Sequence, residues 1–189
     1  MSTTDSLTGL LNRQALLARL EQELVMFEQQ AGTYHCSLAY IDLDNFKIVN
    51  DLLGHDVGDK VLSSFSDLLV DTMRAGDIVA RWGGDEFVVV FPSAKHDQAK
   101  LTAERLLANL TKKNYFKDQL RSWADKPDLV DSLPDLSCSI GITDCGGVEH
   151  SDLNEDWLLK QADRALYRAK AEGKGRVSVM SLSKEFELD

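Results

Sequence analysis

The alternation of hydrophobic and polar positions predicts a chain in which helices and strands interleave along its whole length. Apolar residues recur at helical spacing in four stretches, 5–31 (after an initial turn), 57–75, 97–113 and 154–172. Short apolar runs that are typical of strands lie at 36–42, 136–144 and 176–180. Residues 45–59 are polar and are interrupted by Gly54 and Gly58.

Residues 77–91 predict a β-hairpin. Two strand-like runs, "DIVARW" and "EFVVVF", flank Gly83-Gly84, and a Gly-Gly pair is a strong signal for a two-residue turn. Because a tight hairpin stands among helices and other strands, the pattern favours an α+β fold with an antiparallel or mixed sheet and helices packed on it.

The length of the chain predicts one domain over residues 1–189. Residues 112–135 contain two of the three prolines and show no clean period, so we interpret them as a long connection with room for a short helix. No repeat or low-complexity tract divides the chain. The connection is therefore not a domain boundary.

Composition narrows the classes of function. The net charge of −10 argues against binding a nucleic acid polymer or an anionic membrane, although a small phosphate ligand is compatible with it. The three cysteines (Cys36, Cys138 and Cys145) are odd in number and lack CxxC spacing, which predicts buried free thiols and a cytoplasmic location. No apolar run reaches the length of a membrane span, and "MSTTDSLTG" is no signal peptide.

Acidic residues follow the first strand and the hairpin turn. Asp42 ends the run at 36–42, Asp44 follows two residues later, and Asp85 and Glu86 come directly after the two glycines. If the hairpin lies beside the first strand, these carboxylates converge at one edge of the sheet, where they suit Mg²⁺ and a bound triphosphate. Each acid taken alone is equally well read as a solvated turn residue.

Polar residues that suit a nucleotide follow the first strand. Lys47 could neutralise a phosphoryl group in transfer, or it could be an ordinary surface lysine. Asn50 and Asp59 could read a purine edge by hydrogen bonds, whereas we favour a capping or core role for His55.

Two lysines near the end of the chain share the same ambiguity. Lys170 and Lys174 are four residues apart, so on a helix they would share a face. Such a face is usually solvated, and it contacts a triphosphate only if that helix end points at the acidic edge.

Five motifs taken together closely resemble the GGDEF family of diguanylate cyclases. They occur in the family's order and span nearly the whole chain: "DSLTGLLNR" (5–13), "IDLDNFKIVNDLLGHDVGD" (41–59), "RWGGDEF" (81–87), "SIGIT" (139–143) and "ADRALYRAKAEGKGR" (162–176). The resemblance implies a central, mostly antiparallel five-stranded sheet surrounded by helices, similar to nucleotide cyclase and polymerase palm domains. It also implies condensation of two GTP into cyclic di-GMP with release of two pyrophosphates.

The resemblance also implies roles for individual residues. Two Mg²⁺ ions, or Mn²⁺ in their place, would be held by Asp42, the Leu43 carbonyl, Asp85 and Glu86. Asp85 is the candidate base, but a metal ligand has a lowered pKa and makes a poor base, so its two roles compete. The other implied roles are the transition-state cation for Lys47, guanine contacts for Asn50 and Asp59 with His55 nearby, and γ-phosphate contacts for Lys170 and Lys174.

A product site is implied by "RAGD", residues 74–77. Arg74 and Asp77 match the family's RxxD motif, through which cyclic di-GMP inhibits its own synthesis. Each domain binds one GTP, so activity is expected to need a two-fold homodimer. An upstream sensor domain is expected in the parent protein, which could be anchored to a membrane.

Three features depart from the family pattern. Lys174 stands where many members have Arg, "GKGR" replaces the commoner "GRNR" or "GKNR", and the 112–135 connection looks long. The alternative to an active cyclase is a silent GGDEF module that binds GTP or cyclic di-GMP as a receptor. A purely structural dimerisation domain leaves the convergent acids unexplained.

Overall fold

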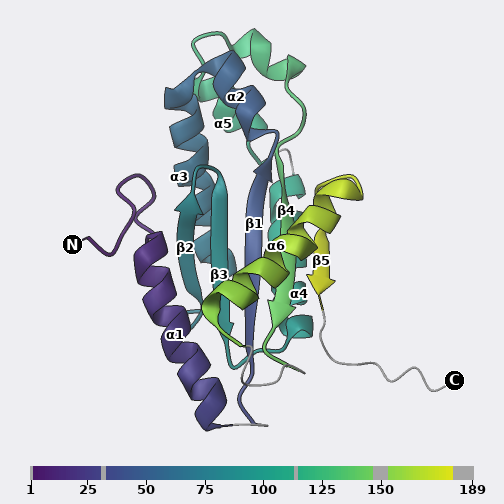
Figure 1. Ribbon diagram of the computed structural model, residues 1–189. Coiled ribbons are helices and arrows are strands. Elements are labelled where there is room, and N and C mark those ends of the chain that lie inside the picture. Colours follow the sequence, from purple (N-terminus) through teal and green to yellow (C-terminus); the bar gives the residue numbers. More distant parts are fainter. Residues whose placement is uncertain (1, 31–32, 113–114, 147–152, 181–189) are drawn as a thin grey trace, which may run out of the picture.

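The computed structural model describes residues 2–30, 33–112, 115–146 and 153–180. In chain order its elements are α1 (Arg13–Gln29), β1 (Cys36–Asp44), α2 (Phe46–Leu53), α3 (His55–Thr72), β2 (Ile78–Gly83), β3 (Glu86–Pro92), α4 (His96–Thr111), α5 (Lys117–Trp123), the 3₁₀ helix η2 (Pro127–Ser132), β4 (Ser137–Asp144), α6 (Glu155–Ala171) and β5 (Val177–Met180). Figure 1 shows helices on both sides of a central sheet.

The sheet has five strands in the order β2-β3-β1-β4-β5. β1 pairs antiparallel with β3 on one side and with β4 on the other, and β5 joins β4 in parallel. The predicted mostly antiparallel α+β sheet is therefore confirmed. The central position of β1 means that any residue at its end is flanked by both neighbouring strands.

Helices cover both faces of the sheet because side chains of β1 alternate between two cores. Leu38 and Tyr40 pack in one core with residues of α1 and α6, including Leu16, Leu20, Leu158 and Leu166. Ile41 and Leu43 pack in the other core with α3 and α4, including Phe65, Leu69 and Leu106. α1 and α6 accordingly lie in front of the sheet in Figure 1, with α3 and α4 behind it.

The polar stretch after β1 contains a helix that the hydrophobic pattern did not predict. Asn45 turns the chain in the left-handed conformation (φ 64°), and α2 follows at once. α2 buries only Phe46 and Val49, so its apolar signal is short. Gly54 then separates α2 from α3, which begins two residues before the predicted start.

The 112–135 segment contains two short helices, α5 and η2, and its apolar residues Phe116, Leu120 and Val130 join the core behind the sheet. The helix that the sequence allowed for in this connection is thus present. The three cysteines are free and buried, as predicted. Within the described residues, no helix is both long and apolar enough to cross a bilayer.

Candidate active site

The carboxylates of β1 and of the hairpin meet at one edge of the sheet. Asp42 stands directly opposite Glu86, the first residue of β3, and directly opposed residues in an antiparallel pair present their side chains on the same face. Asp85 lies in the turn just before Glu86, and its carbonyl accepts the Leu43 amide at 3.2 Å. Of the four carboxylates that were predicted to converge, the structure therefore brings together Asp42, Asp85 and Glu86 at this edge, whereas Asp44 is bound elsewhere.

The turn of the hairpin differs from the prediction by one residue. β2 runs to Gly83 and pairs there with Glu86, so the turn residues are Gly84 and Asp85 rather than Gly83 and Gly84. The pairing register shifts between Arg81 and Gly83, which adds a residue to β2 and moves the turn along the chain. As a result Asp85 is a turn residue. The alternation of side chains along a strand, which would point Asp85 and Glu86 to opposite faces, does not apply to it.

Asp42 is paired with a lysine and still carries unbalanced negative charge. Its Oδ1 lies 3.0 Å from Lys170 Nζ. Burial raises the pKa of Asp42; the hydrogen bond from Lys170 opposes that shift, and the negative charge of Asp85 adds to it. One lysine therefore does not neutralise this edge, which favours a bound cation.

Gly141 on β4 allows α6, which carries Lys170, to pack close to the sheet. A Cβ atom at Gly141 would stand 2.1 Å from the Ala162 carbonyl oxygen and from the Leu166 amide nitrogen. Any side chain there would push α6 away from the sheet. The helix that carries Lys170 thus lies directly on β4.

Glu86 has a partner that the sequence reasoning missed. The Tyr40 hydroxyl donates to Glu86 Oε2 at 3.2 Å. Burial raises the pKa of Tyr40, and the negative charge of Glu86 raises it further, so the hydroxyl keeps its proton. The available signal was the spacing, because Tyr40 precedes Asp42 by two residues and so shares its face of the sheet.

Asp44 has a structural place. Its two carboxylate oxygens accept hydrogen bonds from the Ser139 hydroxyl at 2.9 and 3.0 Å, and Oδ2 also accepts the Gly175 amide at 3.0 Å. The residue is buried. Asp44 thereby ties β1 to β4 and to the turn that follows α6.

Lys174 lies in that turn, so the condition under which it would share a helical face with Lys170 is not met. α6 ends at Ala171, and Lys174 adopts the left-handed conformation with φ 63°. Its Nζ nevertheless lies 3.4 Å from Asn45 Oδ1, just beyond the end of β1. The two lysines reach the same edge of the sheet from different elements.

Asn50 offers an unpartnered polar atom. Its Oδ1 is the buried side-chain N or O atom without a hydrogen-bond partner among the described residues. A Cβ atom at Gly58 would stand 1.8 Å from this oxygen, so the absence of a side chain at Gly58 lets α2 and α3 approach around it. The exposed Asp59 is the next residue along α3. An acceptor that lacks a donor, with a carboxylate nearby, suits the N1–H and amine edge of a guanine.

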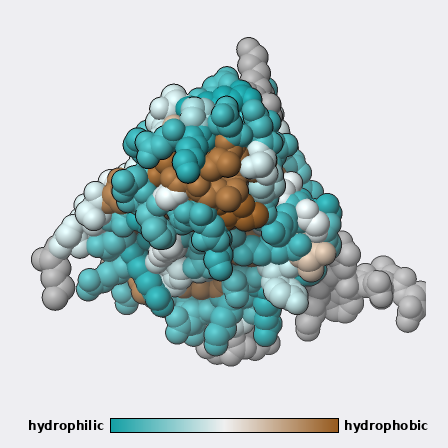
Figure 2. Space-filling model, turned by 90° about the horizontal axis from the view of Figure 1, so that it is seen from above, coloured by the Kyte–Doolittle hydropathy of each residue, from teal (hydrophilic) through white to brown (hydrophobic). Residues whose placement is uncertain are grey.

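Lys47 and His55 are exposed at the starts of α2 and α3. On α2, Ile48 and Leu52 are also exposed, at 39% and 44%. Figure 2 looks down on the end of the molecule that carries α2 and shows apolar side chains gathered there. A group of apolar side chains on a surface is typical of a contact with another molecule.

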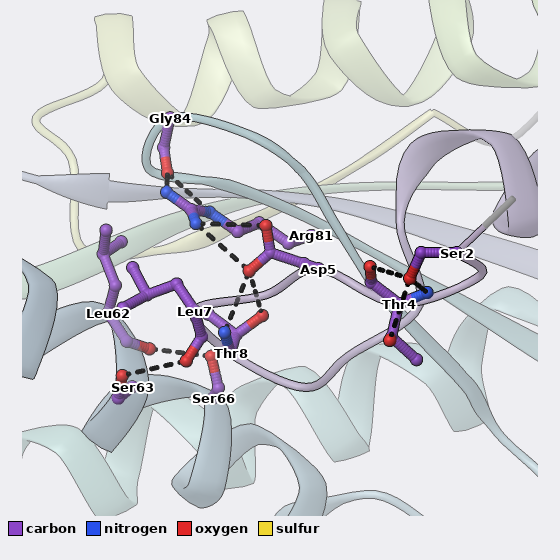
Figure 3. Close-up of polar contacts among 10 residues, drawn as sticks. All are labelled: Ser2, Thr4, Asp5, Leu7, Thr8, Leu62, Ser63, Ser66, Arg81 and Gly84. Atoms are coloured by element: carbon purple, nitrogen blue, oxygen red, sulfur yellow. Dashed lines mark hydrogen bonds and ion pairs between the residues drawn. The ribbon is translucent and has the colours of Figure 1, made fainter.

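The N-terminal loop braces the hairpin turn from the other side. Arg81 donates to both oxygens of Asp5 (3.1 and 3.3 Å) and to the Gly84 carbonyl (3.0 and 2.8 Å), as Figure 3 shows. Asp5 also accepts from the amide and the hydroxyl of Thr8. The tip that carries Asp85 is therefore fixed to the start of the chain.

Arg74 and Asp77 form a local ion pair where α3 leads into β2. Arg74 Nη2 lies 3.0 Å from Asp77 Oδ1, and Asp77 Oδ2 accepts the Arg74 amide at 2.9 Å. The Asp77 side chain is 1% exposed, whereas that of Arg74 is 52% exposed. Asp77 thus holds a guanidinium that faces solvent.

The donor set fits a metal only together with a ligand. Among the described residues, no three His, Cys, Asp or Glu side chains form a cluster that could hold a metal ion. Mg²⁺ is usually held by one or two carboxylates plus substrate phosphates and water. The pair Asp42 and Asp85, with its excess negative charge, fits a cation that arrives with a triphosphate.

Curated relatives match almost the whole chain. The family profile described as diguanylate cyclase, GGDEF domain, matches residues 2–176. Diguanylate cyclase DgcP of Pseudomonas aeruginosa is 38% identical over 93% of this chain and 24% of its own length. For DgcM of Escherichia coli the values are 37%, 92% and 37%, and for the response regulator PleD of Caulobacter vibrioides 34%, 94% and 36%. The chain thus spans between a quarter and about a third of these relatives.

Solved structures agree with the profile. The GGDEF domain of DgcB from Caulobacter crescentus, in complex with c-di-GMP, has a TM-score of 0.79 at 26% identity, covering 95% of this chain and 96% of that one. The active GGEEF domain of a diguanylate cyclase from Vibrio cholerae has a TM-score of 0.73 at 25% identity, covering 89% and 96%. The chain belongs to the GGDEF domain family.

Proposed function

We propose that this domain is a diguanylate cyclase, which condenses two GTP into cyclic di-GMP and releases two pyrophosphates. The observation that carries the proposal is the convergence of Asp42, Asp85 and Glu86 with Lys170 at one edge of the sheet. In the reaction, the 3′-oxygen of each GTP attacks the α-phosphorus of the other. A P–O bond forms as the bond to the leaving pyrophosphate breaks, so the protein mainly positions the groups and neutralises charge.

The guanine base is assigned to the α2–α3 corner. Asn50 Oδ1, which is buried without a partner, accepts from a guanine donor, and Asp59 accepts from another. Lys47 on the first turn of α2 neutralises charge at the phosphoryl group in transfer, and Lys174 contacts the γ-phosphate. His55 lies beside this corner at the start of α3.

The metal-binding residues are assigned to the ends of β1 and of the hairpin. Asp42, the Leu43 carbonyl and Asp85, with Glu86 beside them, would hold two Mg²⁺ ions or Mn²⁺ in their place. When bound, these cations neutralise the triphosphate and make the 3′-hydroxyl a better nucleophile. Lys170 pairs with Asp42 at this edge, and we assign it to the γ-phosphate as well. A carboxylate that serves as a metal ligand makes a poor general base, so we assign Asp85 to the metal before the proton.

Catalysis requires two copies of the domain. Each holds one GTP, so two domains must face one another about a two-fold axis. The exposed Ile48 and Leu52 on α2 give the guanine end an apolar rim that suits such an approach. The relatives are about two and a half to four times as long as this chain, which leaves room for a sensor domain that sets the dimer. Because GTP is a cytoplasmic nucleotide, we place the reaction in the cytoplasm.

Feedback inhibition is assigned to Arg74 and Asp77. The solvent-facing guanidinium, held by a buried carboxylate, is suited to a phosphate or to a guanine edge of the product. Inhibition by added cyclic di-GMP should be lost in Arg74→Ala, and unchanged inhibition in that variant would remove the assignment.

Product formation in a dimer tests the proposed function. The domain is fused to a leucine zipper and incubated with GTP and Mg²⁺, and cyclic di-GMP is measured by chromatography. We expect product from the natural sequence and at least about a hundredfold less from Asp85→Ala. Binding of GTP or cyclic di-GMP without turnover in the forced dimer would instead identify a receptor.

A further inference from the structure

Tyr40 and Glu86 form a contact that the proposed chemistry leaves unexplained. Tyr40 lies on the central strand, opposite Val88 and two residues before Asp42, and is 7% exposed. Its hydroxyl is 3.2 Å from Glu86 Oε2. An apolar ring would fill the same place in the core, so the hydroxyl itself needs an explanation.

The direction of this hydrogen bond is fixed by chemistry. An ionised carboxylate only accepts, so the phenol must donate. Within residues 2–30, 33–112, 115–146 and 153–180, Tyr40 is the hydrogen-bonding partner of the Glu86 side chain, whereas Asp42 is held by Lys170. Each of the two opposed carboxylates at this edge is thus held by one protein donor.

The Tyr40 ring is held on its other side by aromatic packing. Trp82 meets it edge to face, with ring centroids 6.1 Å apart, and the Arg13 guanidinium lies 4.3 Å from the centroid of the Trp82 ring. Trp82 belongs to β2 and Arg13 is the first residue of α1. Trp82, itself covered by Arg13, therefore helps to fix where the hydroxyl lies.

We propose that Tyr40 is a positioning residue for Glu86. By occupying Oε2, the hydroxyl fixes the carboxylate beside Asp42 and leaves Oε1 as the oxygen available to a cation. A carboxylate that is oriented by an outer donor binds a metal with less loss of freedom than one that must be ordered on binding. The inference rests on the proposed function for its role in turnover, but the orientation of Glu86 can be measured without turnover.

The chain supplies a matched control at the opposite end of the sheet. The Tyr34 hydroxyl also donates to a glutamate, Glu23, on α1. Tyr34 lies two residues before the start of β1, whereas the proposed site lies at the end of that strand. Tyr34→Phe therefore removes the same kind of hydrogen bond away from the acidic edge.

The test compares Tyr40→Phe with Tyr34→Phe in the zipper-fused dimer. The first readout is steady-state kinetics with GTP and Mg²⁺. The second is direct Mn²⁺ binding, followed by electron paramagnetic resonance in the presence of 3′-deoxy-GTP, which lacks the attacking hydroxyl. We expect Tyr40→Phe to lower kcat about tenfold and to weaken Mn²⁺ binding about tenfold, with the KM for GTP nearly unchanged. Tyr34→Phe should leave kcat, KM and Mn²⁺ binding at the natural level.

A double-mutant cycle with Glu86→Gln separates positioning from a loss of folding. If Tyr40 acts through Glu86, adding Tyr40→Phe to Glu86→Gln has little further effect on Mn²⁺ binding. Equal Mn²⁺ affinity in Tyr40→Phe and the natural sequence, or fully additive effects in the cycle, would overturn the inference. If the natural sequence binds Mn²⁺ but makes no cyclic product, the proposed function fails, while the binding cycle still decides the role of Tyr40.

Discussion

Asp5 and Asp42 lie on either side of the same hairpin turn, but their surroundings act on them in opposite ways. Asp5 accepts from Thr8 and from Arg81, which in turn donates to the Gly84 carbonyl. Although burial opposes the shift, these hydrogen bonds lower the pKa of Asp5. Its charge is balanced in the folded protein, and its interactions fasten the N-terminal loop to the hairpin (Figure 3).

Asp42 has a single cation, Lys170, and two acidic neighbours. Burial and the charges of Asp85 and Glu86 leave its pKa raised in spite of the lysine. Folding therefore costs free energy at Asp42 and gains it at Asp5. The difference shows which carboxylate maintains the structure and which one is held ready for a positively charged ligand.

Of the variants that test the contrast between Asp42 and Asp5, Asp42→Asn is expected to have the largest effect, and that effect is on activity. Removing the charge removes a candidate metal ligand, so formation of cyclic di-GMP should fall by at least about two orders of magnitude. The amide keeps the size of the side chain and removes repulsion with Asp85, so the thermal midpoint at pH 7 should not fall. Activity is measured by product formation and stability by calorimetry. A large drop in the thermal midpoint would instead show that the Asp42 carboxylate stabilises the fold.

An intermediate effect is expected from Asp5→Asn, and it should appear in stability. The variant can still accept the hydrogen bond from the Thr8 amide, but it loses the ion pair with Arg81. The side chains of Asp5 and Arg81 are only 24% and 15% exposed. We expect a loss of about 2 kcal/mol in the free energy of unfolding, measured by urea denaturation. The activity of the dimer should fall less than tenfold.

A surface ion pair serves as the control for Asp5. Lys100 and Glu104 lie 3.8 Å apart on α4 and are about half exposed. Glu104→Gln should therefore cost no more than about 0.5 kcal/mol. If Asp5→Asn costs as little as this control, the loop is not fastened by the Arg81 ion pair.

Most of the acidic residues at this edge could be predicted, because their positions follow from the spacing of apolar residues and from the glycines of the turn. The apolar run that ends in Asp42 and the hairpin around two glycines were enough to predict that Asp42, Asp85 and Glu86 meet. The turn was displaced by one residue because the register shift in β2 depends on pairing, which the sequence of one strand does not show. The end of the last helix was predicted within one residue, at 172 against Ala171, but the four-residue spacing of Lys170 and Lys174 does not show that the chain turns between them.

The partners of the acids could not be predicted in the same way. The spacing puts Tyr40 on the same face as Asp42, but its contact with Glu86 spans 46 positions, so the strand alone does not show which residue its hydroxyl meets. Asp44 is as acidic as Asp42, but the Ser139 hydroxyl and the Gly175 amide that satisfy it lie more than 90 positions away. Which of two neighbouring carboxylates is free for chemistry is decided by these distant donors.

The smallest and most specific effect is the pH dependence of stability, which should have opposite signs at the two residues. The pKa of Asp42 is raised in the folded state, so the protonated form is favoured there, and its penalty appears as pH rises from the ordinary aspartate value of 3.8 through the folded pKa. The natural sequence should thus lose stability relative to Asp42→Asn over that interval. The pKa of Asp5 is lowered, so its contribution is complete above 3.8 and disappears as pH falls through the folded pKa. Urea denaturation of the three proteins between pH 3 and pH 7 should therefore give difference curves of opposite slope, and parallel curves would show that the two carboxylates have equivalent surroundings.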